Sequence, residues 1–137
     1  MKSRETLIRL KRFQVDEKRR RVAQIEMMIA DFDRMSVDLE REIAQEEQKA
    51  GISDPAHFAY PTYAKAAATR RDNLRRSADD LKVQLDEAKA ELGEAFEELK
   101  KVEILDDRER TTERTVTNAR DRVVMDQIGL NRARVNY

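Results

Sequence analysis

The sequence lacks cysteine and tryptophan, and it holds only two prolines and three glycines in 137 residues. Without cysteine the chain has no disulfide and no thiol nucleophile, which fits a reducing compartment. So few helix breakers leave room for long helices. Aromatic residues make up 5% of the chain and hydrophobic residues 39%. This composition argues against a compact domain with an ordinary core.

Long apolar runs are missing too. No stretch approaches the roughly 20 apolar residues that span a bilayer. The first residues, MKSRETLIRLKRFQVDEKRRR, contain no apolar core followed by a small-residue cleavage site. We therefore expect a soluble, cytoplasmic protein without direct membrane insertion.

Charge is what the chain has in abundance, with 28 basic and 28 acidic residues that together make up 41% of it. Abundant Ala, Glu, Lys, Leu and Arg with helical periodicity is typical of coiled coils. Disordered chains share the high charge and the scarcity of aromatics. The apolar periodicity of both halves decides against disorder.

Two heptad seams carry this periodicity. Apolar or small residues recur at steps of three and four in the first half (Val22, Ile25, Ile29, Phe32, Ser36, Leu39, Ile43) and in the second half (Leu74, Ala78, Leu81, Leu85, Ala88, Leu92, Ala95, Leu99, Val102). They predict helices over about 4–49 and about 62–132. Lys11 and Lys18 occupy d positions, so we expect a weaker seam there.

Both prolines and the single histidine fall in the segment GISDPAHFAYPTYA, residues 51–64. Gly51 and Asp54-Pro55 end the first helix, and Pro61-Thr62 begins the second. A bend over about 50–61 between two heptad helices predicts an all-α fold. We expect one domain over residues 1–137, an antiparallel coiled-coil hairpin with the longer helix second.

Pairing Lys49 with Thr62 sets the register and places Val22 near Ala88. Residues 1–22, with nine basic and three acidic side chains, then lie beside the acidic part of the second helix, since residues 79–109 hold twelve acids and five bases. Opposite charges favour this monomeric hairpin over a parallel dimer.

The unequal helix lengths make the first helix end opposite about residue 106. There the a positions turn polar (Asp106, Glu113, Arg120, Gln127), while Val116, Val123 and Leu130 keep d positions apolar. We expect a half-polar seam without an internal partner, which indicates a protruding helix that meets another protein. The alternative is a frayed, solvated terminus.

Catalysis is not expected. His57 stands alone, without a nucleophile or base grouping, and the sequence shows no phosphate-binding loop and no metal-ligand spacing. We expect no enzyme activity, no metal and no cofactor.

Basic clusters at 18–21, 70–71 and 75–76 are interleaved with acids, which favours acidic protein partners over nucleic acid. Phe58, Tyr60 and Tyr63 stand near the bend. Two interpretations stay open for these rings: exposed anchors for a protein partner, or a local cap over Ile43 or Ala67.

Three segments resemble the FliJ family of the flagellar type III export apparatus: Glu5-Thr6-Leu7 with Leu10 and the run VDEKRRR, a central break with Tyr60 and Tyr63, and VVMDQIG at 123–129. Gln127 stands where the family pattern has an acid.

The resemblance implies an antiparallel coiled coil, similar to the central stalk of rotary ATP synthases. Its end with both termini would bind the export ATPase ring through Leu7, Leu10, Arg12, Arg120, Val123, Asp126 and Leu130. Its other end would bind the cytoplasmic domain of the export gate through Tyr60, Tyr63, Ala67 and Leu74. The family also implies escort of export chaperones and peripheral association with the inner membrane.

Two alternatives remain beside this role. One is a structural coiled coil without a rotary partner, possibly dimeric, and the other is a helical protein that binds nucleic acid.

Overall fold

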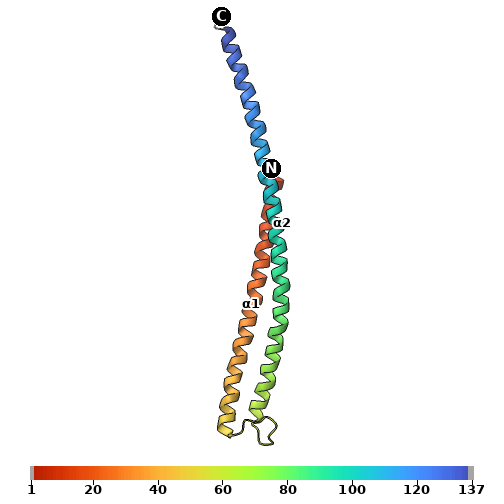
Figure 1. Ribbon diagram of the computed structural model, residues 1–137, viewed down its shortest axis with the longest axis vertical. Helices are drawn as coiled ribbons and strands as arrows, with labels where there is room; N and C mark the ends of the chain where they lie inside the picture. The colour runs from red at the N-terminus through yellow and green to blue at the C-terminus, as the bar shows by residue number, and fades with distance from the viewer. Residues whose placement is uncertain (1, 136–137) are drawn as a thin grey trace. The chain divides into compact units, whose positions relative to one another are not determined.

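The computed structural model describes the backbone of residues 2–135 and the side chains of residues 3–133. Within these residues it contains two helices and no strand, α1 (Lys2–Ala50) and α2 (Thr62–Val135), of 49 and 74 residues. Figure 1 shows the chain turning back on itself through the bend between them. The predicted all-α hairpin with a longer second helix is confirmed.

The end of α1 is fixed by Gly51, whose φ of 70° is left-handed and accessible to glycine without strain. The backbone N–H groups of Gly51 and Ile52 both donate to the carbonyl oxygen of Glu47, at 2.9 and 3.3 Å. These bonds satisfy a carbonyl that the helix itself leaves without a partner. The sequence prediction that Gly51 ends the helix therefore has a direct structural basis.

Hydrogen bonds between residues close in sequence order the bend itself. The Asp54 carboxylate accepts the N–H of Ala56 at 3.0 Å, and the Asp54 carbonyl accepts the N–H of His57 at 3.0 Å. The ring Nδ1 of His57 accepts the N–H of Ala59 at 3.0 Å. Since Asp54 and His57 bond to neighbouring backbone, they hold the loop conformation. α2 then begins at Thr62, as expected.

The chain falls into two compact units, one of Gln14–Ala95 and one of the residues up to Phe13 together with those from Phe96 onward. In the first of these, α1 and α2 lie side by side (Figure 1) and pack through two apolar clusters. The larger cluster has Val22, Ile25, Leu81 and Ala88 as buried members, with Ile29, Phe32, Leu85 and Leu92 against it. Val22 and Ala88 therefore share a cluster, as the predicted register requires.

The second cluster lies beside the bend and contains Ile43, Ala64 and Ala67. Between the clusters in sequence stand the buried residues Ser36 and Ala78, with 5% and 1% of their surface exposed. The Ser36 hydroxyl donates to the carbonyl of Phe32 at 2.9 Å, so its polar group is satisfied within α1. Small residues at these positions allow the two helices to approach closely.

The lysines at d positions bridge the two helices. Lys18 contacts Glu91 at 2.9 Å within the Gln14–Ala95 unit, and Lys11 contacts Glu98 at 2.9 Å within the other unit. The hydrogen bond and the positive charge of each lysine lower the pKa of Glu91 and of Glu98 below their ordinary value. Where the sequence predicted a weaker apolar seam, the long lysine side chains span it and end in ion pairs.

Neither helix, over the described residues, is long and apolar enough to cross a membrane.

Candidate functional site

Arg4, on the first turn of α1, meets three carboxylates of α2. Its Nε lies 3.4 Å from Asp106 Oδ1, its Nη1 bonds to Glu109, and its Nη2 donates to Glu113 Oε1 at 3.0 Å. Asp106 is 7% exposed, and its Oδ2 also forms an ion pair with the Nε of Arg110 at 3.1 Å. The sequence predicted that the polar a positions from Asp106 onward have no partner within the chain. This prediction is wrong for Asp106 and Glu113, which both contact Arg4. The reason is that α1 starts with an arginine long enough to reach both.

The surroundings of Arg4 favour its charged form. Desolvation lowers the pKa of its guanidinium, but the hydrogen bond to Glu109 and the charges of Glu113, Glu109 and Asp106 outweigh it and raise the pKa above its ordinary value. The Nε contact with Asp106 is a charge contact without the alignment of a hydrogen bond. Arg4 therefore stays a fixed cation at the start of α1.

The next residues of α1 present apolar and basic side chains to solvent. Leu7 is 42% exposed and Leu10 is 49% exposed. Arg12 is exposed and reaches Glu103 at 4.0 Å, the limit of an ion pair. The three residues of α1 that the resemblance assigns to the ATPase lie within the unit that also contains the end of α2.

Beyond Asp106, α2 carries no cover within the described part of the chain, and every residue from Asp107 to Ala133 is exposed. Val116, Ala119, Val123 and Val124 line an apolar surface beside Arg120. Leu130, about two turns beyond Val123, is 66% exposed, and Asp126 between them is exposed. Figure 1 shows this stretch of α2 as a single helix. The residues assigned to the ATPase on α2 are thus all available to a partner.

The aromatic side chains near the bend differ in how far they are exposed. Tyr60 packs against the cluster of Ile43, Ala64 and Ala67 and donates its hydroxyl to Glu47 at 2.9 Å. Phe58 is 96% exposed and stacks on His57 with the ring centroids 4.8 Å apart. The local-cap interpretation is confirmed for Tyr60, and the role of an anchor for a protein partner stays a prediction. Tyr60 is the local cap and Phe58 is the exposed aromatic.

Tyr63 combines exposure with a fixed position. It is 54% exposed, and its hydroxyl donates to Glu42 at 2.7 Å. That hydrogen bond raises the pKa of Tyr63, while burial followed by the bond to Glu47 raises the pKa of Tyr60. Of the other residues assigned to the export gate, Leu74 is half-buried and Ala67 is buried at 5% exposure.

A shallow groove is lined by Tyr63 and Leu74 of α2, by Met35 and Leu39 of α1, and by the charged side chains of Asp38, Glu42 and Arg70. Sequence reasoning missed the contribution of α1 to this surface. Met35 stands just before the a position Ser36, so its heptad position was the available signal for a residue flanking the seam.

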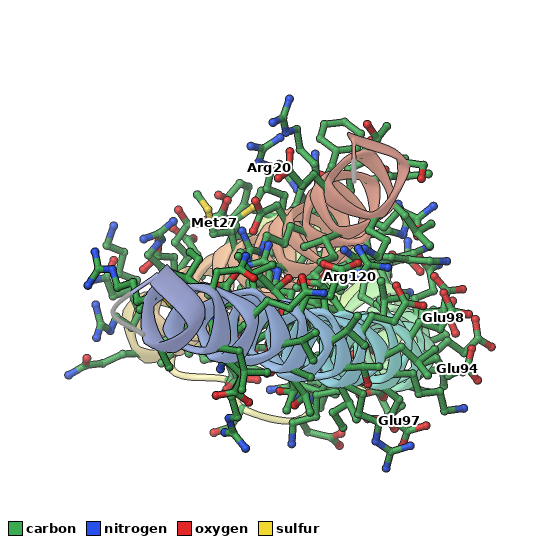
Figure 2. All side chains as sticks on the ribbon, turned by 90° about the horizontal axis from the view of Figure 1, so that it is seen from above. Arg20, Met27, Glu94, Glu97, Glu98 and Arg120 are labelled. Atoms are coloured by element: carbon green, nitrogen blue, oxygen red, sulfur yellow. The ribbon has the colours of Figure 1, made fainter. Side chains whose placement is uncertain are left out.

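The basic clusters are divided between ion pairs and solvent. Arg71 and Arg75 both pair with Glu40. Figure 2 shows that the side chains of Arg20 and Met27, which are both exposed, extend outward from α1. No group of three or more metal-binding side chains occurs among the residues with described placement.

Comparison with known proteins identifies one family. The family model described as "Flagellar FliJ protein" matches residues 1–136. The searches among curated proteins and among solved structures found no match. Family membership implies a role related to flagellar protein export. A match over essentially the whole chain, on a two-helix fold with a longer second helix, shows that this protein belongs to the FliJ family.

Proposed function

We propose that the chain binds the ring of the flagellar export ATPase through the unit that contains its N-terminal turns and the exposed end of α2. The observation that carries this proposal is the exposure of every residue from Asp107 to Ala133 on a helix that keeps apolar d positions. An apolar stripe without an intramolecular partner favours contact with another protein. On this proposal the protein acts as a central stalk that promotes assembly and activity of the ring.

The contact would combine apolar and charged groups. Val123 and Leu130 offer exposed apolar side chains, and Arg120 and Asp126 supply charges of both signs beside them. Leu7, Leu10 and Arg12 add a second exposed surface in the same unit. Apolar centres flanked by charges are typical of specific protein interfaces.

ATP hydrolysis by the cognate export ATPase tests this proposal. We expect the intact chain to stimulate hydrolysis, and Val123→Asp combined with Leu130→Asp to remove most of the stimulation. The matched control is Val83→Asp, because Val83 is 60% exposed on the paired part of the same helix. Equal stimulation by all three proteins, or none by the intact chain, would contradict the stalk role.

The same proposal assigns the groove near the bend to the cytoplasmic domain of the export gate. Tyr63 and Leu74 line this groove with Leu39, which also packs, like Tyr60, against the cluster that contains Ala67. Pull-down with the isolated gate domain should weaken several-fold for Tyr63→Ala. Val37→Ala, at a 49% exposed position of α1, should bind normally. Loss of binding in both variants would remove Tyr63 from the proposed contact.

The proposal further includes escort of export chaperones and peripheral association with the inner membrane through the export apparatus. Light scattering tests the monomeric hairpin, and a stable dimer would favour the structural coiled-coil alternative. Electrophoretic mobility shifts at low ionic strength test nucleic-acid binding, which should be absent because the basic clusters contact acids such as Glu40 and Glu91.

A further inference from the structure

Arg4 contacts a long stretch of α2 from a single position of α1. Its three partners Asp106, Glu109 and Glu113 are spaced by three and four residues, so they lie on one face of the helix. All three acids belong to α2, and only 16% of the Arg4 side chain is exposed. The guanidinium thereby connects the buried Asp106 to Glu113, which lies seven residues further along α2.

The segment around Glu113 is poorly suited to a helix. Five of its seven residues are β-branched (Thr111, Thr112, Thr115, Val116, Thr117). Such side chains lose rotamer freedom against the preceding helical turn. The hydroxyls of Thr111, Thr112 and Thr115 also donate to the carbonyls four residues earlier, at 2.8, 2.9 and 2.9 Å. This bonding pattern slightly destabilises and bends helices.

No packing offsets that weakness, because all described residues from Asp107 onward are exposed. The exposed part of α2 must therefore be helical through its own propensity and through propagation from an ordered neighbour. Glu109 and Glu113 are held by α1 through Arg4, and they flank the start of the threonine-rich segment. The ordered neighbour is thus the turn that Arg4 fixes.

We propose that Arg4 is a latch by which the first turn of α1 keeps the threonine-rich segment 111–117, and through it residues 118–133, helical. When the first turn of α1 is displaced, Glu109 and Glu113 lose their cation and the exposed helix loosens. A partner that binds either the N-terminal turns or the end of α2 would then change the order of the other. This coupling goes beyond the proposed ATPase contact and does not depend on it.

Hydrogen exchange followed by mass spectrometry on the full chain tests the latch. We expect Arg4→Gln to speed exchange of the amides of residues 116–133 by about three- to tenfold, while residues 64–95 exchange as before. Glu113→Gln removes one of the three contacts and should give a smaller increase in the same peptides. The control is Arg12→Gln, which removes a cation from the same end of α1 whose ion pair with Glu103 lies outside the threonine-rich segment.

A second pair of changes tests the threonine part. Thr112→Ala with Thr115→Ala, introduced into the Arg4→Gln chain, should restore the slower exchange of residues 116–133. Exchange that is equally fast in the unaltered protein and in Arg4→Gln overturns the latch, as does an equal increase in Arg12→Gln. Failure of the alanines to slow exchange overturns the role of the threonine-rich segment. Faster exchange in residues 64–95 would mean that Arg4→Gln unfolds the hairpin, and Glu113→Gln then decides.

Discussion

Two stretches of α2 share one helix and one heptad period but differ in what they bury. Between Ala64 and Ala88 the apolar seam side chains are alanines and leucines, and Ala64 is 0% exposed. Between Val116 and Leu130 the large apolar side chains are 42 to 66% exposed and are interrupted by the polar a positions Arg120 and Gln127. The heptad period therefore fixes which residues share a face, while the point at which α1 begins decides whether that face is covered, since even the polar a position Asp106 is buried beside Arg4.

The largest effect should come from the main cluster, in which α1 covers α2. Ile25→Ala removes a side chain that is 3% exposed within the main cluster, and we expect the free energy of unfolding to fall by about 2 to 4 kcal/mol. Urea unfolding monitored by circular dichroism measures it. Met27→Ala, at a 68% exposed position two residues away, should change it by less than about 0.5 kcal/mol. Similar losses in both variants would show that burial in the main cluster does not determine the stability of the chain.

The buried alanines provide the next test. Ala88 is 4% exposed in the main cluster, so Ala88→Leu must push the helices apart and should destabilise the chain by about 1 to 3 kcal/mol. Ala90→Leu, at an exposed position of the same helix, should stay within about 0.5 kcal/mol of the unaltered chain. If Ala88→Leu were tolerated equally well, close approach of the helices at this layer would be disproved.

A smaller change, of opposite sign, is expected at Ser36. Alanine has the higher helix propensity, and the buried hydroxyl of Ser36 bonds only to the carbonyl of Phe32 in its own helix. Ser36→Ala should therefore raise the free energy of unfolding by about 0.5 kcal/mol. Ser77→Ala, at an exposed position, reports the propensity alone. A loss of stability in Ser36→Ala would show that the hydroxyl contributes to the core.

The smallest effect concerns acid. Because Glu91 and Glu98 have a lower pKa in the folded chain, their stabilisation is complete above their ordinary value of 4.5 and is lost as pH falls through the lowered values. Lys11→Gln with Lys18→Gln should flatten the fall of the thermal midpoint below pH 4.5. Lys82→Gln, whose ion pair with Asp79 lies within α2, is the control. An unchanged acid profile in the double variant would mean that the bridges add no stability.

Most of the fold was predictable because it follows from local periodicity. Steps of three and four around Val22 and Leu81 predict helices, and the breakers at Gly51 and Pro61 place the bend, so the helices begin and end within three residues of the expected positions. The register followed from pairing residues on either side of the bend.

The site was less predictable because its contacts join residues far apart in sequence. Arg4 and Asp106 are separated by 102 positions, and whether they meet depends on register to within one helical turn. A heptad pattern also treats a lysine at a d position as a gap, although Lys11 and Lys18 reach acids on the other helix. In the bend no periodicity exists to tell the covered Tyr60 from the exposed Phe58.

The hydrogen bonds of Tyr60 and Tyr63 also make the bend a spectroscopic probe. The chain has no tryptophan, and its three tyrosines include these two. Each donates its hydroxyl to a carboxylate of α1, and each has a raised pKa. The ultraviolet absorbance change that accompanies phenol ionisation therefore reports closure of the hairpin at this end, without any added label. If a partner separates the helices there, the two tyrosines should ionise at a pH closer to their ordinary value of 10.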